Sequence, residues 1–268
     1  MPELPEVETI KNELVPHVLG RTITGVAVFW DRMVRQPPLP EFCGRVTGQK
    51  ITGLSRLGKY LFFHLGSGEK LVMHMKMTGS LLIDPPEDKF TRAVFQLDSG
   101  AALHFRDPRK FGVMWLAPDE SAVARHLGPD PLSDDFTVGT LAGILKGRKA
   151  PVKPVLLDQS VMAGIGNMYA DEALYEAKIH PERPAGSLSG EEIKRLYRAI
   201  RRVLRAAIKN KGASVRNYIR PDGDIGRAHD EFRVAHGTGK NCPRCGTPIK
   251  RIVVRGRGTY FCPKCQRI

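Results

Sequence analysis

The sequence lacks three features that would place the protein in a membrane or outside the cell. Its 268 residues contain no run of 18 apolar side chains, so we expect no membrane-spanning helix. The first residues lack the basic-then-apolar order of a secretory signal, which predicts a cytoplasmic protein. Cysteine is scarce, with five residues, four of them in the last 27 positions. A disulfide framework would be spread more widely, and the cytosol would reduce it.

Acidic residues are also few compared with basic ones. The chain has 42 Lys+Arg and 28 Asp+Glu, which gives a formal net charge of +14. Such an excess favours a polyanionic partner, with nucleic acid ahead of an anionic membrane surface. The rest of the composition is typical of a globular protein, and the length suffices for two domains and a small appendage.

The hydrophobic pattern changes from strands to helices along the chain. A short helix is expected at the start, and Pro16 predicts that this helix ends or bends there. From residue 21 to about residue 116, short β-branched or aromatic segments follow one another, which predicts a mostly antiparallel sandwich or barrel. Further on, the clearest helix starts at Ser189, with Glu192 as its capping-box partner. The basic face of this helix is typical of a solvated surface as much as of a binding surface.

Two C-x-x-C pairs, Cys242/Cys245 and Cys262/Cys265, are separated by 16 residues. Each pair can place two thiolates on one tight turn, and two such turns complete a tetrahedron around Zn²⁺. A redox dithiol is the less favoured alternative. Four thiolates fill the coordination shell, so the predicted zinc is structural. The basic hairpin expected between the pairs suits phosphate or a DNA groove.

We therefore predict an α+β multidomain fold with an N-terminal antiparallel β-sandwich, a flanking helix, a helical domain and a C-terminal β-hairpin zinc finger. The predicted boundaries are residues 1–127 for the sandwich, 128–139 for a linker, 140–236 for the helical domain and 237–268 for the zinc finger.

The N-terminus offers a candidate nucleophile once Met1 is removed, as it commonly is before a small residue. Pro2 would then present an α-amine, whose reference pKa is about 8, against about 10.4 for lysine. Only the neutral amine attacks a carbon electrophile, and attack on C1′ of a deoxyribose would give a Schiff base. Glu3 could act there as a general acid or base. By itself this signal is weak, because a glutamate near a helix start is usually a dipole partner.

Six segments in one order carry a more specific signal. They are PELPEVET, LGKYL, HMKMTGS, DPRKFG, GIGNMYADE and GRGTYFCPKCQ. Together they run from one end of the chain to the other and resemble the formamidopyrimidine-DNA glycosylase family, bacterial enzymes that remove oxidised purines such as 8-oxoguanine. The resemblance implies a bifunctional glycosylase and abasic-site lyase of base excision repair, which flips the damaged base out of duplex DNA. It also implies one structural zinc ion and a helix–two-turn–helix motif in the helical domain. We further expect a monomer without membrane association, located at the bacterial nucleoid.

The resemblance assigns catalytic roles to four residues. Pro2 is implied as the nucleophile that forms the Schiff base, and Glu3 as the group that transfers protons at the sugar. Lys59 is implied to lie near the DNA backbone and the damaged nucleotide. Arg257 is implied to grip the phosphates beside the flipped base and to assist the second step of β,δ-elimination.

The resemblance also implies three residues that fill the gap left by the flipped base. Met77 and Phe111 would replace the lost stacking, and Arg109 would hydrogen-bond the orphaned cytosine. Without the resemblance, Met77 and Phe111 would be interpreted as core residues of the sandwich.

Four further residues are candidates for contacts with the DNA backbone. Asn167, Lys149 and Lys153 are implied around a phosphate clamp. His74 lies in the HMKMTGS segment, where a backbone contact or a satisfied buried histidine is favoured over a catalyst.

Two regions depart from the family pattern. Phe90 stands where a DNA-contacting histidine is usual, so Arg92 or Lys89 could supply the charge instead. The base-recognition region from Lys211 onward lacks the usual double glycine, and Arg216 is a candidate contact within it.

Two alternative functions remain open from the sequence. An endonuclease VIII-like glycosylase would share the fold and the amine chemistry but prefer oxidised pyrimidines. A non-catalytic, zinc-dependent protein that binds damaged DNA would have the same charge and the same zinc ribbon.

Overall fold

The computed structural model describes residues 1–86 and 88–268. They form two compact units, the first made of Met1–Arg125 and Asn210–His229, and the second of His126–Lys209 and Asp230–Ile268. The sequence-based division assigns residues 210–229 to the helical domain, whereas the structure groups them with the first unit. The physical reason is that Tyr218 is buried in the first unit's hydrophobic core.

The first unit is built on two β-sheets that enclose its core. One sheet has the strand order β1–β7–β8–β6, with bounds Ile23–Val28, Thr91–Leu97, Ala102–Arg106 and Ser80–Ile83. The other has the order β2–β9–β5–β4–β3, with bounds Val34–Gln36, Val113–Ala117, Lys70–His74, Tyr60–Leu65 and Ile51–Leu57. Only the short β2–β9 pairing is parallel among the pairings of these two sheets in the described residues. The mostly antiparallel sandwich is thus confirmed.

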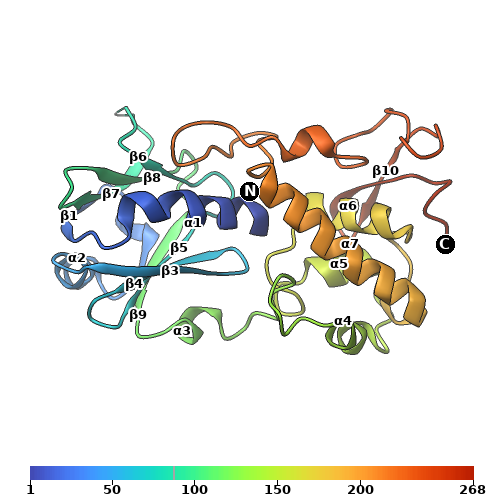
Figure 1. Ribbon diagram of the computed structural model, residues 1–268, viewed down its shortest axis with the longest axis horizontal. Coiled ribbons are helices and arrows are strands. Elements are labelled where there is room, and N and C mark those ends of the chain that lie inside the picture. The colour runs from blue at the N-terminus through green and yellow to red at the C-terminus, as the bar shows by residue number, and fades with distance from the viewer. Residues whose placement is uncertain (87) are drawn as a thin grey trace. The chain divides into compact units, whose positions relative to one another are not determined.

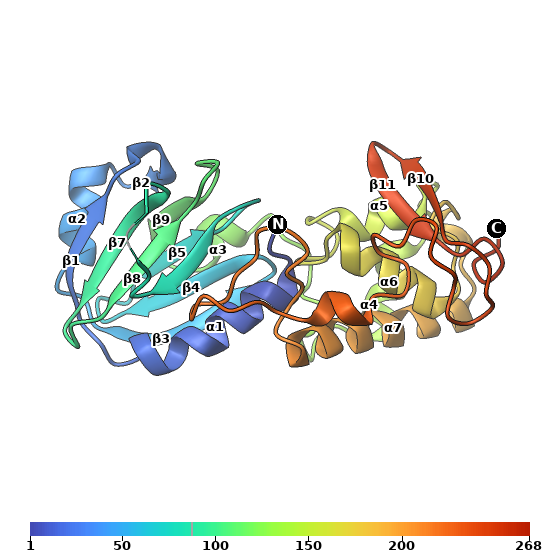
Figure 2. The same cartoon turned by 90° about the horizontal axis from the view of Figure 1, so that it is seen from above.

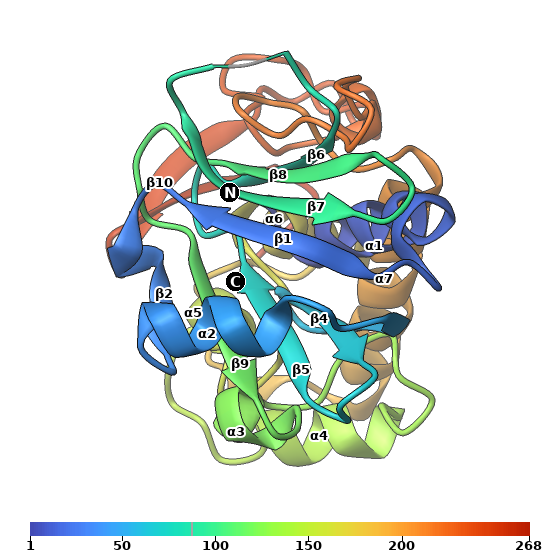
Figure 3. The same cartoon turned by 90° about the vertical axis from the view of Figure 1, so that its left-hand side faces the viewer.

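Two helices cover the open sides of this sandwich. Helix α1 (Leu4–Val18) packs against β3 and β6, the edge strands on one side. Helix α2 (Leu39–Val46) packs against β1 and β2, the edge strands on the other side. Figure 3 shows the two helices on opposite sides of the sheets. Covered edges cannot pair with strands of another chain, which is one way in which sheet proteins avoid aggregation. Two shorter elements, η1 (Asp31–Met33) and α3 (Ser121–Ala124), complete the unit.

Helix α1 runs past Pro16, where the sequence predicted an end or a bend. Its apolar stripe, which includes Ile10 and Leu14, is fully buried in the core. The helix does not end at Pro16 but continues to Val18. Because Pro16 lies in the last turn, its missing N–H deprives only the Asn12 carbonyl of an intrahelical donor.

The second unit consists of helices and a two-stranded hairpin. Its helices are α4 (Val138–Leu145), α5 (Val152–Leu157), α6 (Asn167–Ala177) and α7 (Gly190–Lys209), with a 3₁₀ turn η2 (Ala185–Ser187). A second 3₁₀ turn, η3 (Ala228–Glu231), lies where the chain passes from the first unit to the second. Helix α6 packs against α5, α7 and β11, and it lies between α7 and the hairpin in Figures 1 and 2. The hairpin strands are β10 (Lys250–Val254) and β11 (Arg257–Phe261).

Helix α7 confirms the predicted capping box. The Ser189 N–H donates to Glu192 Oε2 at 2.8 Å, and the Glu192 N–H donates to Ser189 Oγ at 3.3 Å. Leu196, Ile200 and Leu204 are buried along the predicted apolar stripe. None of the helices in the described residues combines the length and the apolar character needed to cross a membrane.

Candidate active site and zinc centre

The four predicted zinc ligands lie together at the base of the β10–β11 hairpin. Their Sγ atoms are all within 4.8 Å of one another, with Cys242–Cys265 at 3.9 Å and Cys245–Cys262 at 3.5 Å. Tetrahedral zinc with Zn–S bonds of about 2.3 Å requires S–S separations of about 3.8 Å. The thiols therefore fit one zinc ion, and the fourfold sulfur shell leaves no position for substrate.

Replacing Cys242 by Ser should empty this site. Cys242 is buried and its Sγ lies 3.3 Å from the Tyr175 hydroxyl, so the loss disturbs the hairpin's attachment to α6. We expect zinc to fall from one equivalent to below about half, and DNA affinity to drop about tenfold or more, because structural zinc supplies folding energy. Metal analysis and a DNA-binding titration measure both effects. The matched control is Cys43→Ser, because Cys43 is a cysteine of the first unit and not one of the four clustered thiols. A Cys242→Ser protein with full zinc and normal DNA binding would refute the assignment of Cys242 as a zinc ligand.

The N-terminal amine lies in a partly enclosed, charged environment of the first unit. Met1 is half exposed, whereas Pro2 and Glu3 are buried. Burial lowers the pKa of the Met1 amine, and the positive charges of Lys59 and Arg216 lower it further, while Glu3 and Glu6 act in the opposite direction. Pro2 is buried one residue inside Met1, so we expect removal of Met1 to leave the new amine near the same charged groups. A lowered pKa increases the neutral, nucleophilic fraction at neutral pH.

Glu6 ties this N-terminus to a distant part of the sequence. Its Oε2 accepts the Glu3 N–H at 2.8 Å, and its Oε1 accepts the Ala213 N–H at 2.8 Å. One carboxylate thus fixes the backbone of Glu3 and the start of the segment that carries Arg216. Sequence reasoning did not identify Glu6, although it lies within the quoted PELPEVET segment.

Lys59 and His74 lie near each other on neighbouring elements. Lys59 is buried in the turn between β3 and β4, and His74 ends β5. Burial lowers the pKa of His74 to about 3, helped by the charges of Lys76 and Lys59. His74 Nδ1 accepts the Lys76 N–H at 3.0 Å, and its ring packs edge-on against Tyr60. These contacts describe a buried, hydrogen-bonded histidine that is neutral at physiological pH, and a DNA-backbone contact by His74 stays a prediction.

The three predicted gap-filling residues converge from two loops. Arg109 Nη1 donates to Met77 Sδ at 3.6 Å, and the Arg109 guanidinium carbon lies 4.6 Å from the centre of the Phe111 ring. Met77 is 45% exposed and Phe111 is 44% exposed. Apolar side chains so exposed are not sandwich core, which removes the alternative interpretation.

Asp107, a residue that sequence reasoning missed, holds both loops in place. This buried carboxylate accepts the N–H groups of Phe111 and Gly112 at 2.7 and 2.6 Å, and the Thr78 hydroxyl from the other loop. The signal was present in the sequence as the first residue of DPRKFG. Gly112 also allows the close approach, because a Cβ there would lie 2.6 Å from the Phe105 ring.

Arg92 has structural partners in this region. Its Nε donates to the Asp107 carbonyl at 2.8 Å and its Nη1 to the Lys89 carbonyl at 3.0 Å. The Phe90 ring faces the Lys89 ammonium at 5.4 Å and the Arg106 guanidinium at 4.9 Å. Positive side chains therefore gather around the position where the family pattern has a histidine.

In the second unit, Lys153 is not a surface residue. Its side chain and that of Asp171 are both 0% exposed, with Nζ 2.7 Å from Asp171 Oδ1. The ammonium also donates to the Gly258 carbonyl and the Thr259 hydroxyl, both at 2.9 Å. The predicted phosphate contact by Lys153 is therefore wrong in this structure: the lysine anchors β11 to α5 and α6.

The other predicted residues of this unit are more accessible. Asn167 begins α6, is half buried, and donates through Nδ2 to the Gly258 carbonyl at 3.0 Å. Lys149 and Arg257 are exposed. Arg257 starts β11, directly after the hairpin turn at Arg255 and Gly256, whose positive φ angles suit a tight turn.

Three family models match the chain in succession. They describe a formamidopyrimidine-DNA glycosylase N-terminal domain (residues 1–114), a formamidopyrimidine-DNA glycosylase H2TH domain (residues 127–218) and a zinc finger found in FPG and IleRS (residues 239–268). The zinc-finger match and the clustered thiols together confirm one structural zinc site.

Whole-chain comparisons agree. The formamidopyrimidine-DNA glycosylases of Pelotomaculum thermopropionicum and a Roseiflexus species are 44% and 45% identical to the chain, each alignment covering 100% of both proteins. A crystal structure of a Lactococcus lactis FPG mutant in complex with Fapy-dG-containing DNA has a TM-score of 0.93 at 36% identity, covering 100% of both chains. The MutM (FPG) protein of Thermus thermophilus has a TM-score of 0.90 at 41% identity, covering 99% of this chain and 98% of that one. These likenesses confirm the predicted fold class.

Proposed function

The chain belongs to the formamidopyrimidine-DNA glycosylase family, and from that premise we propose that it excises oxidised purines from duplex DNA with the amine of Pro2 as nucleophile. The observation that carries the proposal is the environment of the chain's first amine, that of Met1, whose pKa is lowered by burial and by Lys59 and Arg216. Pro2 is buried directly behind it, and we expect the amine exposed by removal of Met1 to experience the same charges. Glu3 lies next to it in the chain and is buried with it.

The proposed reaction begins with the neutral Pro2 amine attacking C1′ of the damaged nucleotide. The C1′–N bond to the base breaks, and the base leaves as it takes up a proton. Glu3 transfers the protons that accompany base loss and opening of the sugar ring. Ring opening gives an iminium ion, which acidifies C2′, so loss of a C2′ proton expels the 3′ phosphate. A second elimination, in which the C4′ proton is lost and the C5′–O bond breaks, expels the 5′ phosphate.

Lys59 and Arg257 have supporting roles in this proposal. Lys59 places a positive charge near the amine, which favours the neutral nucleophile and suits the DNA backbone. Arg257 is exposed at the start of β11, where a guanidinium can bind the phosphates that flank the lesion.

A base inside a duplex cannot reach the amine, so the lesion must be flipped out at a cost of a few kcal/mol. We assign Met77 and Phe111 to the vacated space and Arg109 to the orphaned base. Their exposure and mutual contacts support this assignment. The other proposed DNA contacts are His74, Arg92, Lys149, Asn167 and Arg216.

We propose the functional division as a sandwich (1–127), a linker (128–139), a helix–two-turn–helix domain (140–236) and a zinc finger (237–268), with the exception that residues 210–229 pack with the sandwich. We also propose that the protein is a monomer in the bacterial cytoplasm, at the nucleoid. Its net charge of +14 suits the DNA partner.

Duplexes with one defined lesion test the proposed specificity. We expect faster cleavage of 8-oxoguanine paired with cytosine than of thymine glycol, and a covalent protein–DNA adduct when borohydride is present. A preference for thymine glycol would identify an endonuclease VIII-like specificity instead. Tight binding without base release or adduct would identify a non-catalytic damage-binding protein.

A further inference from the structure

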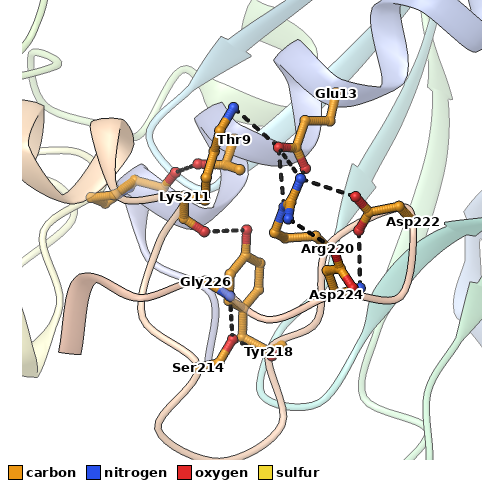
Figure 4. Close-up of polar contacts among 10 residues, drawn as sticks. Thr9, Glu13, Lys211, Ser214, Tyr218, Arg220, Asp222, Asp224 and Gly226 are labelled. Atoms are coloured by element: carbon orange, nitrogen blue, oxygen red, sulfur yellow. Dashed lines mark hydrogen bonds and ion pairs between the residues drawn. The ribbon is translucent and has the colours of Figure 1, made fainter. Parts of the chain in front are cut away.

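The segment that carries Arg216 lies along one polar stripe of α1. Glu6, Thr9 and Glu13 are spaced three and four residues apart, so they share one face of the helix. Glu6 accepts the Ala213 N–H, and Glu13 binds Lys211 and Arg220. Figure 4 shows Thr9 and Glu13 of α1 facing this segment.

The segment is also closed upon itself. The Tyr218 hydroxyl donates to the Lys211 carbonyl at 3.1 Å, and Ser214 Oγ donates to the Tyr218 carbonyl at 2.7 Å. The Gly226 N–H donates to the same Ser214 Oγ at 2.9 Å (Figure 4). Gly212 permits the close approach at the start, because a Cβ there would lie 2.8 Å from Tyr218 and 2.9 Å from Glu6.

The outer attachment of the segment is an ion pair. Arg220 Nε contacts Glu13 Oε1 and Oε2 at 3.1 and 3.0 Å, and its Nη2 contacts Oε1 at 2.9 Å. The Arg220 and Glu13 side chains are 19% and 16% exposed, so the pair is largely shielded from water. Charge-assisted bonds to both carboxylate oxygens are stronger and more directional than a single exposed contact. Asp222 and Asp224 also contact Arg220, but they are more exposed and screened.

We propose that Glu13 and Arg220 form a latch that holds segment 211–226 beside the N-terminal amine, so that this ion pair controls the environment of the nucleophile. The proposal rests on the proposed use of that amine. Both residues act through the segment and are positioning residues, since neither contacts the reacting atoms.

The latch has a consequence for the charge state of the amine. The groups that act on the chain's first amine, that of Met1, are Glu3 at the N-cap of α1, Glu6 of α1, Lys59 of the β3–β4 turn and Arg216 of the segment, and burial has the largest effect. Release of the segment withdraws Arg216 and exposes the amine to water. Both changes raise the amine's pKa, so less of it is neutral at a given pH below that pKa.

The test uses the free protein, so it does not depend on DNA chemistry. Wild type, Glu13→Gln, Arg220→Gln and the double variant, all verified to start at Pro2, are treated with formaldehyde and cyanoborohydride over a range of pH. Mass spectrometry follows methylation of the Pro2 nitrogen. At the acid end of the pH range, we expect methylation of each variant to be about threefold or more slower than methylation of wild type. Each rate is first divided by the rate of the same protein at its alkaline plateau. The double variant should match the single variants, because each one already opens the same latch.

Matched controls are Glu41→Gln and Arg45→Gln, which break an exposed ion pair on α2. Both should follow the wild-type pH profile. Arg220→Lys keeps the charge but loses the two-oxygen contact, so its normalised methylation rate at the acid end should lie between those of wild type and Arg220→Gln. It takes the place of Arg220→Gln in the test if that variant unfolds. If folded Glu13 and Arg220 variants showed the same normalised pH profile of methylation as wild type, the latch would be overturned. Wild-type adduct formation with 8-oxoguanine duplex is scored separately, so failure of the proposed reaction and failure of the latch remain distinguishable.

Discussion

A variant in which Pro2 is preceded by a retained residue should form no reducible adduct with damaged DNA. One bulky residue inserted between Met1 and Pro2 keeps Met1 in place and turns the Pro2 nitrogen into an amide. An amide nitrogen shares its lone pair with the carbonyl and does not attack C1′. We expect strand cleavage to fall by roughly 10³-fold or more, the scale seen when a covalent nucleophile is removed.

DNA binding should survive this change. Met1 is 50% exposed, so an added residue can extend into solvent without displacing the core. Single-turnover cleavage and a binding titration on the same duplex separate the two effects. The same residue added after the exposed Ile268 is the control, and it should leave both measurements unchanged. Undiminished adduct formation by a protein that mass spectrometry shows to retain Met1 would exclude the amine mechanism.

Glu3→Gln should bind damaged DNA normally and fail to release the base. The Glu3 backbone N–H still reaches Glu6, so the start of α1 is preserved while the proton-transfer group is lost. General acid–base catalysis is worth about 10²–10⁴-fold, and we expect a loss of that size in the excision of 8-oxoguanine. Released base, measured under single-turnover conditions, gives the rate, and anisotropy gives the affinity.

Glu41→Gln is the charge-matched control for this variant. Glu41 is an exposed carboxylate of α2, so its replacement should change neither rate nor affinity. Base release by Glu3→Gln within about threefold of wild type would remove Glu3 from the mechanism.

The sequence predicts the parts of the fold that depend on local chemistry. The α7 capping box, the cysteine pairs and the alternating strands are each encoded within a few residues, and the structure contains them. The assignment of residues 210–229 depends instead on where Tyr218 is buried, which local pattern does not reveal. Pro16 shows a related limit, because proline is tolerated in a last turn whose position the sequence does not specify.

The candidate site also has parts that the sequence predicts and parts that it does not. The residues proposed to fill the gap were predicted from their segments, but the carboxylate of Asp107 that joins the two loops became visible only with the contacts between them. The prediction for Lys153 failed because its partner, Asp171, follows 18 positions later on another helix. Glu13 and Arg220 lie 207 residues apart, a separation at which charge pairing leaves no local pattern.

The proposed mechanism requires that the Pro2 nitrogen is the atom that joins the DNA. The most direct measurement is peptide mapping of the borohydride-reduced adduct formed with an 8-oxoguanine duplex. We expect the sugar remnant to be attached to the peptide that begins at Pro2, with Met1 absent. Attachment to a lysine such as Lys59, with an unmodified Pro2 terminus, would contradict it.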